Sequence, residues 1–334
     1  MNTKININPC DNRSSQKGIV YKKTGDSYIL HSNDQYIPCN LASSLQKNFD
    51  YSAKGKVRSV HLLHHDPIAV GDEVRFAKQD SGPGQIVEIL PRHNWISRRT
   101  AVPMPGALPG EQVIAANVDL VMPVFAAADP PPKWNLLDRY LVSAEAAGIL
   151  AQVCITKVDL VEKGEVVDPD LLAIAEEYRR IGYPVLLTSV INGHGLAELK
   201  EILLGKTTVL LGKSGVGKTS LLNALDPGLG QRVSEISAFT GKGRHTTSVS
   251  ELFPLAGGGA LMDTPGIREF GLWDVSDEDL AGYFPEMRPF IGRCKFGMNC
   301  SHDEEPGCAI RKAVMAGQIS PRRYASYLHI REDI

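Results

Sequence analysis

The chain has 334 residues, of which 43% are hydrophobic and 22% charged, so its composition is that of an ordinary globular protein and excludes a disordered or fibrous chain. This length predicts about two or three domains. The longest apolar runs, such as residues 118–128, fall short of the roughly 20 residues that cross a bilayer. The first residues also lack the apolar core of a secretory signal, so we expect a cytoplasmic protein with no membrane partner.

The first third of the chain has the pattern of a small β-barrel. Short alternating runs separated by turn residues extend from residue 17 to about 98 and predict five or six strands. Residues 1–100 hold 14 Lys and Arg against 9 Asp and Glu, whereas residues 101–275 hold 14 against 20. We therefore expect a flexible N-terminus at 1–16 and an OB-like, RNA-binding barrel at 17–100. On charge alone, a solvated surface of mixed sign is an equally good interpretation.

From about residue 118 the pattern changes to alternating strands and helices. Apolar strands are expected at 118–127, 150–156, 183–190 and 206–211, and amphipathic helices at 134–148, 169–182 and 194–205. This alternation predicts a parallel sheet with helices on both faces over residues 101–275. Loops that carry chemistry should lie at the carboxyl ends of the strands.

A phosphate-binding loop follows the last of these strands. The pattern G-x-x-x-x-G-K-T and the next residue comprise Gly212, Lys213, Ser214, Gly215, Val216, Gly217, Lys218, Thr219 and Ser220. The glycines let backbone N–H groups approach phosphate oxygens, and the helix that follows adds its positive end. We expect Lys218 to reach the β- and γ-phosphates and the Thr219 hydroxyl to bind Mg²⁺.

Three further short motifs each lie at a predicted strand end. They are "TKVD" with Thr156, Lys157 and Asp159, "TS" with Thr188 and Ser189, and "DTPG" with Asp263 and Gly266. An aspartate such as Asp159 can accept two hydrogen bonds from guanine, where adenine offers a mismatch. Asp263 fits the switch that senses the γ-phosphate and holds Mg²⁺ through water. Because the base-reading motifs precede the phosphate loop, the order is a circular permutation of the usual GTPase order.

On these motifs the chain, from about residue 17 onward, resembles the bacterial small-subunit-dependent ribosomal GTPase family of the RsgA type. The resemblance implies GTP hydrolysis during late maturation of the small (30S) ribosomal subunit, with rRNA, GTP and GDP as partners and a monomeric chain. It places Thr247 or its neighbour Thr246 on the γ-phosphate side of Mg²⁺. Since "DTPG" leads within about thirty residues into the C-terminal segment, we expect γ-phosphate sensing to reorient both flanking domains.

One position departs from common GTPase patterns in a way that affects catalysis. Ile267 follows "DTPG", where many GTPases have the glutamine that orients water. A branched aliphatic side chain cannot hold water by a hydrogen bond, so another group must do so. The resemblance makes His245, in "GRHTT", the candidate catalytic residue. Thr156 stands where many GTPases have asparagine, and threonine is also seen in the family that the chain resembles.

The C-terminal segment, residues 276–334, is predicted to be helical and to bind zinc. Cys294, Cys300, His302 and Cys308 lie within fifteen residues of one another, a Cys₃His set suited to one tetrahedral zinc ion. Four protein ligands leave no open position, so we expect a structural Zn²⁺. The final helix should begin with Ser320 as its cap and Pro321 in its first turn.

Other functions are compatible with part of these motifs. The phosphate loop alone would suit a P-loop ATPase or a small-molecule kinase, although Asp159 and "DTPG" argue against both. An RNA-binding module with a degenerate nucleotide site is a third class, which the intact Lys218, Thr219 and Asp263 argue against. The main alternative is a P-loop nucleotide hydrolase that acts on another RNA or ribonucleoprotein target.

Overall fold

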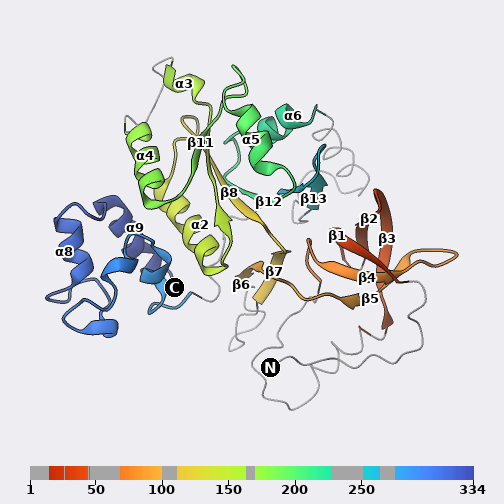
Figure 1. Ribbon diagram of the computed structural model, residues 1–334, viewed down its shortest axis with the longest axis horizontal. Coiled ribbons are helices and arrows are strands. Elements are labelled where there is room, and N and C mark those ends of the chain that lie inside the picture. The colour runs from red at the N-terminus through yellow and green to blue at the C-terminus, as the bar shows by residue number, and fades with distance from the viewer. Residues whose placement is uncertain are drawn as a thin grey trace, which may run out of the picture.

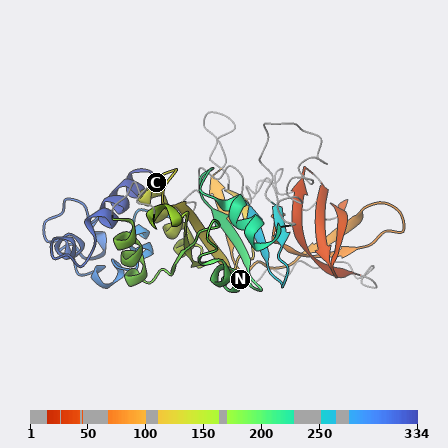
Figure 2. The same cartoon turned by 90° about the horizontal axis from the view of Figure 1, so that it is seen from above.

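The computed structural model describes residues 15–25, 27–43, 45, 68–99, 111–162, 170–227, 251–263 and 275–334. Three parts follow one another along the long axis of the molecule (Figure 1). A β-barrel lies at one end, a mixed sheet with helices lies in the middle, and a helical segment lies at the other end, as Figure 2 shows from above. The middle part therefore contacts both others.

The N-terminal part is a closed five-stranded barrel. Its strands are β1 (Gln16–Thr24), β2 (Ser27–Ser32), β3 (Gln35–Leu41), β4 (Glu73–Ala77) and β5 (Gly84–Ile89). They pair in the order β1-β2-β3-β5-β4, and β4 closes the barrel on β1. The β3–β5 pair is parallel and the other pairs are antiparallel. This Greek-key order confirms the predicted OB-like barrel, while the part of the predicted barrel at residues 46–67 lies outside the described residues.

Two pairings join the barrel to the middle part. Strand β6 (Trp95–Arg99) forms an antiparallel ribbon with β7 (Glu111–Ala116). Strand β1 of the barrel also pairs with β13 (Glu251–Pro254), the edge strand of the central sheet. The barrel and the central sheet are therefore hydrogen-bonded into one continuous sheet.

The central sheet contains the predicted parallel strands. It comprises β8 (Leu120–Ala126), β10 (Val153–Thr156), β11 (Val185–Leu187), β12 (Thr207–Leu211) and β14 (Ala260–Asp263), together with the short β9 (Leu150–Ala151) and the antiparallel β13. The order across the sheet is β11-β10-β8-β12-β14-β13. Every residue of β8 is buried, as expected for a central strand covered on both faces.

Helices cover both faces of this sheet. They are α2 (Trp134–Ala146), the short α3 (Asp159–Glu162), α4 (Leu171–Ile181), α5 (Leu196–Leu203) and α6 (Lys218–Leu225). Apolar residues of α2 and α4 pack into one buried cluster, and those of α5 and α6 pack into another. The predicted helices at 134–148, 169–182 and 194–205 are confirmed, and each end lies within two residues of its predicted position.

The C-terminal part is built from short helical turns around its own core. It comprises the 3₁₀ turns η1 (Leu280–Tyr283), η2 (Arg288–Phe290) and η3 (Gly297–Asn299) and the helices α8 (Ala309–Met315) and α9 (Pro321–Glu332). Val142 of α2 belongs to the same buried cluster, so the core crosses the boundary. Pro321 occupies the first turn of α9 as predicted, but the Ser320 hydroxyl makes no capping hydrogen bond among the described residues. Across the described ranges, every helix is too short or too polar to span a lipid bilayer.

Candidate functional site: a nucleotide-binding edge and a metal centre

The phosphate loop connects the carboxyl end of β12 to the start of α6. A Cβ atom at Gly212 would lie 2.4 Å from the carbonyl oxygen of Val124, so the loop passes too close to β8 for any other residue. Gly215 and Gly217 have φ angles of +85° and +94°, which favour glycine. The Lys218 ammonium donates to the carbonyl oxygens of Gly212 and Lys213 at 2.6 and 3.0 Å. These bonds hold its positive charge inside the loop, where phosphate oxygens would bind.

The base-reading motif "TKVD" lies beside this loop at the end of β10. The Thr156 hydroxyl donates to the carbonyl oxygen of Val216 at 2.5 Å, and the carbonyl oxygen of Phe125 lies 3.3 Å away. Thr156 is buried, and its hydroxyl connects the base-reading loop to the phosphate loop through Val216 and to β8 through Phe125. The sequence predicts nucleotide contact for Thr156, and its bond to the phosphate loop is an additional finding.

The predicted base-support loop meets Asp159. The Ser189 hydroxyl donates to Oδ1 of Asp159 at 2.6 Å, and both residues are buried. The main-chain N–H of Val158 donates to the carbonyl oxygen of Thr188, which fixes the two loops against each other. A carboxylate held through one oxygen in this way has a defined orientation toward the edge of the sheet. The "TKVD" and "TS" motifs are therefore brought together as predicted from strand order.

One segment that borders the nucleotide-binding edge is not predicted from the sequence. The prolines of residues 128–135 suggest no more than a simple connection. In the structure, the Lys157 ammonium donates to the carbonyl oxygen of Asp129, and Pro130 lies 3.6 Å from the Cβ position of Gly215. The signal that could have found this segment is its position directly after β8, at the same carboxyl edge as the other loops.

The γ-phosphate side is described only in part. Thr219 and Ser220 are exposed in the first turn of α6, and Lys213 and Ser214 are exposed in the loop. Asp263 ends β14, with its main chain in register with Leu210 of β12, just before the phosphate loop. Its side chain lies outside the described part of the chain, as do His245, Thr246, Thr247, Gly266 and Ile267.

The four predicted zinc ligands converge on one buried point in the C-terminal part. Tetrahedral zinc, at about 2.3 Å from sulfur and about 2.0 Å from nitrogen, separates two sulfurs by about 3.8 Å and a sulfur from a nitrogen by about 3.6 Å. The Sγ atoms of Cys294 and Cys308 lie 4.0 Å apart, and Nδ1 of His302 lies 3.5 and 3.6 Å from them. Together with Cys300, all four ligand atoms lie within 4.8 Å of one another. The donor set and spacing fit a tetrahedral metal ion.

Neighbouring groups hold these ligands in place. The N–H groups of Ala309 and Arg311 donate to Sγ of Cys294 and Cys308 at 3.2 and 3.5 Å, and the Tyr324 hydroxyl donates to the carbonyl oxygen of His302 at 2.7 Å. Burial raises the pKa of Cys300 to about 12. A thiolate in this environment needs a cation to offset its charge, which is the role of a bound metal.

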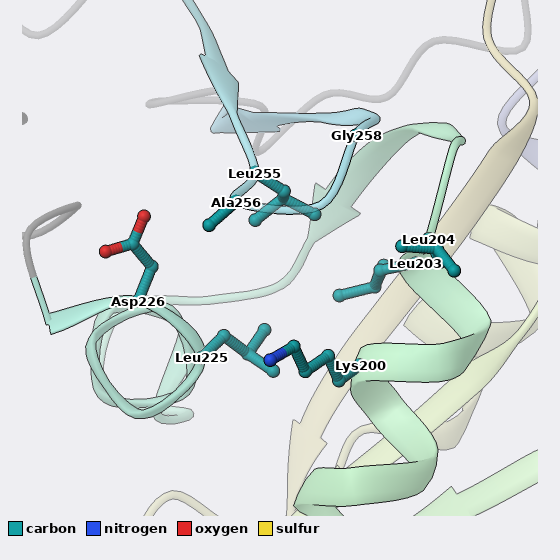
Figure 3. Close-up of a pocket in the computed structure, with 8 residues that line it drawn as sticks. All are labelled: Lys200, Leu203, Leu204, Leu225, Asp226, Leu255, Ala256 and Gly258. Carbon is teal, nitrogen blue, oxygen red and sulfur yellow. The ribbon is translucent and has the colours of Figure 1, made fainter.

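A small pocket lies away from the nucleotide-binding edge. Its walls come from the carboxyl ends of α5 and α6 and from the turn between β13 and β14 (Figure 3). Lys200 and Asp226 are its charged residues, and four leucines, Ala256 and Gly258 line the remainder. Because the β13–β14 turn precedes the amino end of β14, this pocket lies at the opposite edge of the sheet from the phosphate loop and takes no part in the site.

Comparison with known proteins agrees with this geometry. The RsgA GTPase family model matches residues 89–273. Proteins named small ribosomal subunit biogenesis GTPase RsgA are similar to this chain. The one from Bacteroides fragilis is 39% identical, over 95% of this chain and 96% of its own length. The one from Gemmatimonas aurantiaca is 40% identical, over 96% and 98%. The one from Pseudomonas aeruginosa is 45% identical, over 84% and 80%.

Two solved structures share the whole architecture. YjeQ from Thermotoga maritima superposes with a TM-score of 0.69 at 31% identity, covering 96% of this chain and 98% of that one. YloQ, described as a circularly permuted GTPase, gives a TM-score of 0.66 at 31% identity and covers 96% of both chains. The permuted loop order of this chain therefore agrees with the description of one of these structures, and the similarity extends over nearly the whole chain. The chain belongs to the RsgA GTPase family.

Proposed function

We propose that this chain hydrolyses GTP while bound to the small ribosomal subunit during late maturation, and that its GTP or GDP state controls binding and release. The observation that carries the proposal is the convergence of the phosphate loop and the base-reading loop, joined by the bond from Thr156 to Val216. The names of its relatives support the target, because they are biogenesis GTPases of that subunit. Activity on the ribosome also supports a cytoplasmic location, and we further propose that the chain is a monomer.

Each nucleotide-site residue has a proposed role. Asp159, oriented by Ser189, accepts hydrogen bonds from guanine, with Lys157 and Thr188 completing the base pocket. Lys218 leaves its loop carbonyls for the β- and γ-phosphates, and main-chain N–H groups of the loop surround the remaining oxygens. His245 orients the attacking water, because Ile267 cannot.

Two metal ions complete the proposal. Mg²⁺ bound with GTP would offset the charge that develops on the phosphates, and Thr219, Asp263 and Thr247 or Thr246 are its candidate ligands. The register of Asp263 with Leu210, beside the phosphate loop, supports this set. One structural Zn²⁺ would be held by Cys294, Cys300, His302 and Cys308, whose separations fit tetrahedral coordination.

We further propose four parts along the chain. They are an N-terminal segment at 1–16, an RNA-binding barrel at 17–100, a permuted GTPase domain at 101–275 and a zinc-binding domain at 276–334. The closed barrel with its own core supports the first division, and the C-terminal core, to which α2 contributes Val142, supports the last one. The ribbon of β6 and β7 spans the first boundary, so a cut near residue 100 would separate paired strands.

The test is GTP hydrolysis with and without purified small subunits. We expect slow turnover by the free protein and stimulation by small subunits, with large subunits and unrelated structured RNA as matched controls. Competition between GTP and ATP in the same assay measures base preference. Stimulation by unrelated RNA but not by small subunits would favour the alternative target. A folded protein with no GTP hydrolysis under either condition would refute the proposal.

A further inference from the structure

The junction between the barrel and the central sheet has an unusual local geometry. Lys22 of β1 is in register with Glu251, the first residue of β13. The pairing of β1 with β2 is irregular between Val20 and Lys22, which is the signature of a β-bulge. A bulge redirects the side chains of the bulged strand, and both Tyr21 and Lys22 are buried there. Lys22 is thereby directed out of the barrel toward the GTPase part.

Lys22 and Glu251 form an ion pair across this junction. Nζ of Lys22 lies 2.9 Å from Oε2 of Glu251, and the two side chains are only 11% and 17% exposed. Water screens such a pair far less than a surface pair. Removal of one partner leaves the other as a poorly solvated charge without its counter-ion.

The position of Glu251 connects this pair to the nucleotide site. Glu251 is in register with Asp263 on β14, and Asp263 is in turn in register with Leu210 on β12. One row of main-chain positions therefore runs from Lys22 in the barrel to the strand that enters the phosphate loop. Glu251 also directly follows residues 228–250, the part of the sequence that contains His245 and Thr247.

We infer that Lys22 and Glu251 are positioning residues that fix β13, and through it the main chain at Asp263, in the arrangement that binds Mg²⁺ with GTP. The inference rests on the proposed GTPase function. Strand β13 has only four residues and lies between β1 and β14. An ion pair at its first residue therefore fixes the register of the whole strand. A target bound to the barrel would act on the metal site through this contact.

The test compares four variants with the wild-type full-length protein. Lys22→Met removes the charge and keeps the aliphatic stem, Glu251→Gln keeps the shape, and Lys22→Arg should restore the pair. Glu88→Gln is the matched control, because Glu88 pairs with Arg75 within the barrel at 3.1 Å with both side chains 40% exposed. Circular dichroism and thermal unfolding establish that each variant is folded.

The first measurement is binding of a non-hydrolysable GTP analogue with and without Mg²⁺. Lys22→Met and Glu251→Gln should reduce the Mg²⁺-dependent gain in affinity by about tenfold. GDP affinity without Mg²⁺ should change by less than about twofold. The second measurement is subunit-stimulated hydrolysis, in which kcat should fall by about tenfold or more with little change in KM. Lys22→Arg and Glu88→Gln should match the wild type in both measurements.

Two results would overturn the inference. One is an unchanged Mg²⁺-dependent gain in Lys22→Met and Glu251→Gln, even if their thermal stability falls. The other is an equal loss in Glu88→Gln, which would indicate a general effect of charge in the barrel. A wild-type protein that binds GTP with Mg²⁺ but does not hydrolyse it would refute the proposed function instead, and the binding measurement would still decide the role of this pair.

Discussion

Arg323 of α9 is a fully buried charge, and its replacement should loosen the C-terminal part. Its side chain is fully buried and bridges two carboxylates from different parts of the molecule. It donates to Oδ1 of Asp138 on α2 at 2.6 Å and to both oxygens of Glu286 at 2.7 and 3.1 Å. Burial acts to lower the pKa of Arg323, but Asp138 and Glu286 raise it well above its usual range, so the guanidinium stays charged.

The loss in free energy of unfolding caused by Arg323→Met depends on which partners the buried carboxylate of Asp138 retains. Asp138 is also fully buried and would keep the Tyr178 hydroxyl at 2.5 Å and Nη1 of Arg322 at 3.4 Å as polar partners. Removal of one partner from a buried ion pair costs about 3–5 kcal/mol. Because Tyr178 and Arg322 still stabilise the carboxylate, we expect the lower end, about 3 kcal/mol. Arg323→Lys should lower the free energy of unfolding somewhat less than Arg323→Met does, because an ammonium can still pair with one carboxylate. It should not match the wild type, because an ammonium cannot bridge two carboxylates.

Urea unfolding followed by circular dichroism, with zinc and GDP present, measures this loss. The control is Glu176→Gln on α4, whose exposed pair with Arg179 spans 3.3 Å and should contribute no more than about 0.5 kcal/mol. Zinc content by elemental analysis reports whether the C-terminal part stays folded around its ligands. If Arg323→Met lowers the free energy of unfolding by less than about 1 kcal/mol, the network does not hold the two parts together.

The remaining predictions concern the nucleotide and metal sites. Lys218→Ala should weaken GTP binding by at least about tenfold in calorimetry, because a charged donor to phosphate is lost; near-normal hydrolysis by the folded variant would contradict the assignment. Asp159→Asn should reduce the preference for GTP over ATP by about a hundredfold in competition binding, since an amide cannot accept both hydrogen bonds from guanine. Cys300→Ser should lose bound zinc and retain guanine-nucleotide affinity, and a wild-type protein without zinc in elemental analysis would contradict that prediction. His245→Ala should abolish most subunit-stimulated turnover while GTP-dependent binding to the subunit persists; wild-type turnover would place the catalytic group elsewhere.

The parts of the site that lie on regular elements could be predicted from the sequence. A phosphate loop after an apolar strand, and short motifs at the ends of the next strands, are enough to identify the carboxyl edge of a parallel sheet. The bond between Ser189 and Asp159 follows from that edge, because β10 and β11 are neighbours. The clustering of the four candidate zinc ligands could be predicted for a similar reason, since all four lie within one short segment.

Contacts between distant segments could not be predicted in the same way. The bond from Lys22 to Glu251 joins residues far apart in the chain, and no local pattern marks either residue as paired. The adjacent arginines Arg322 and Arg323 stand out in the last helix, but a charged pair in a helix is usually a solvated face. Their burial depends on the carboxylates of other elements, which only the tertiary structure brings to them.

The two flanking domains are attached to the GTPase part in different ways, and this difference bears on how nucleotide state reaches them. The C-terminal part shares a core with α2 through Val142 and is fixed by the buried charges around Arg323, which cannot separate without exposing Asp138. The barrel is attached through the pairing of β1 with β13, through the buried pair of Lys22 and Glu251, and through the bridge between Val70 and Ala115. Of the two attachments, only that of the barrel includes a strand in register with Asp263. The expectation that both flanking domains reorient therefore implies two routes, one to the barrel directly through β13 and one to the C-terminal part through α2 of the GTPase core.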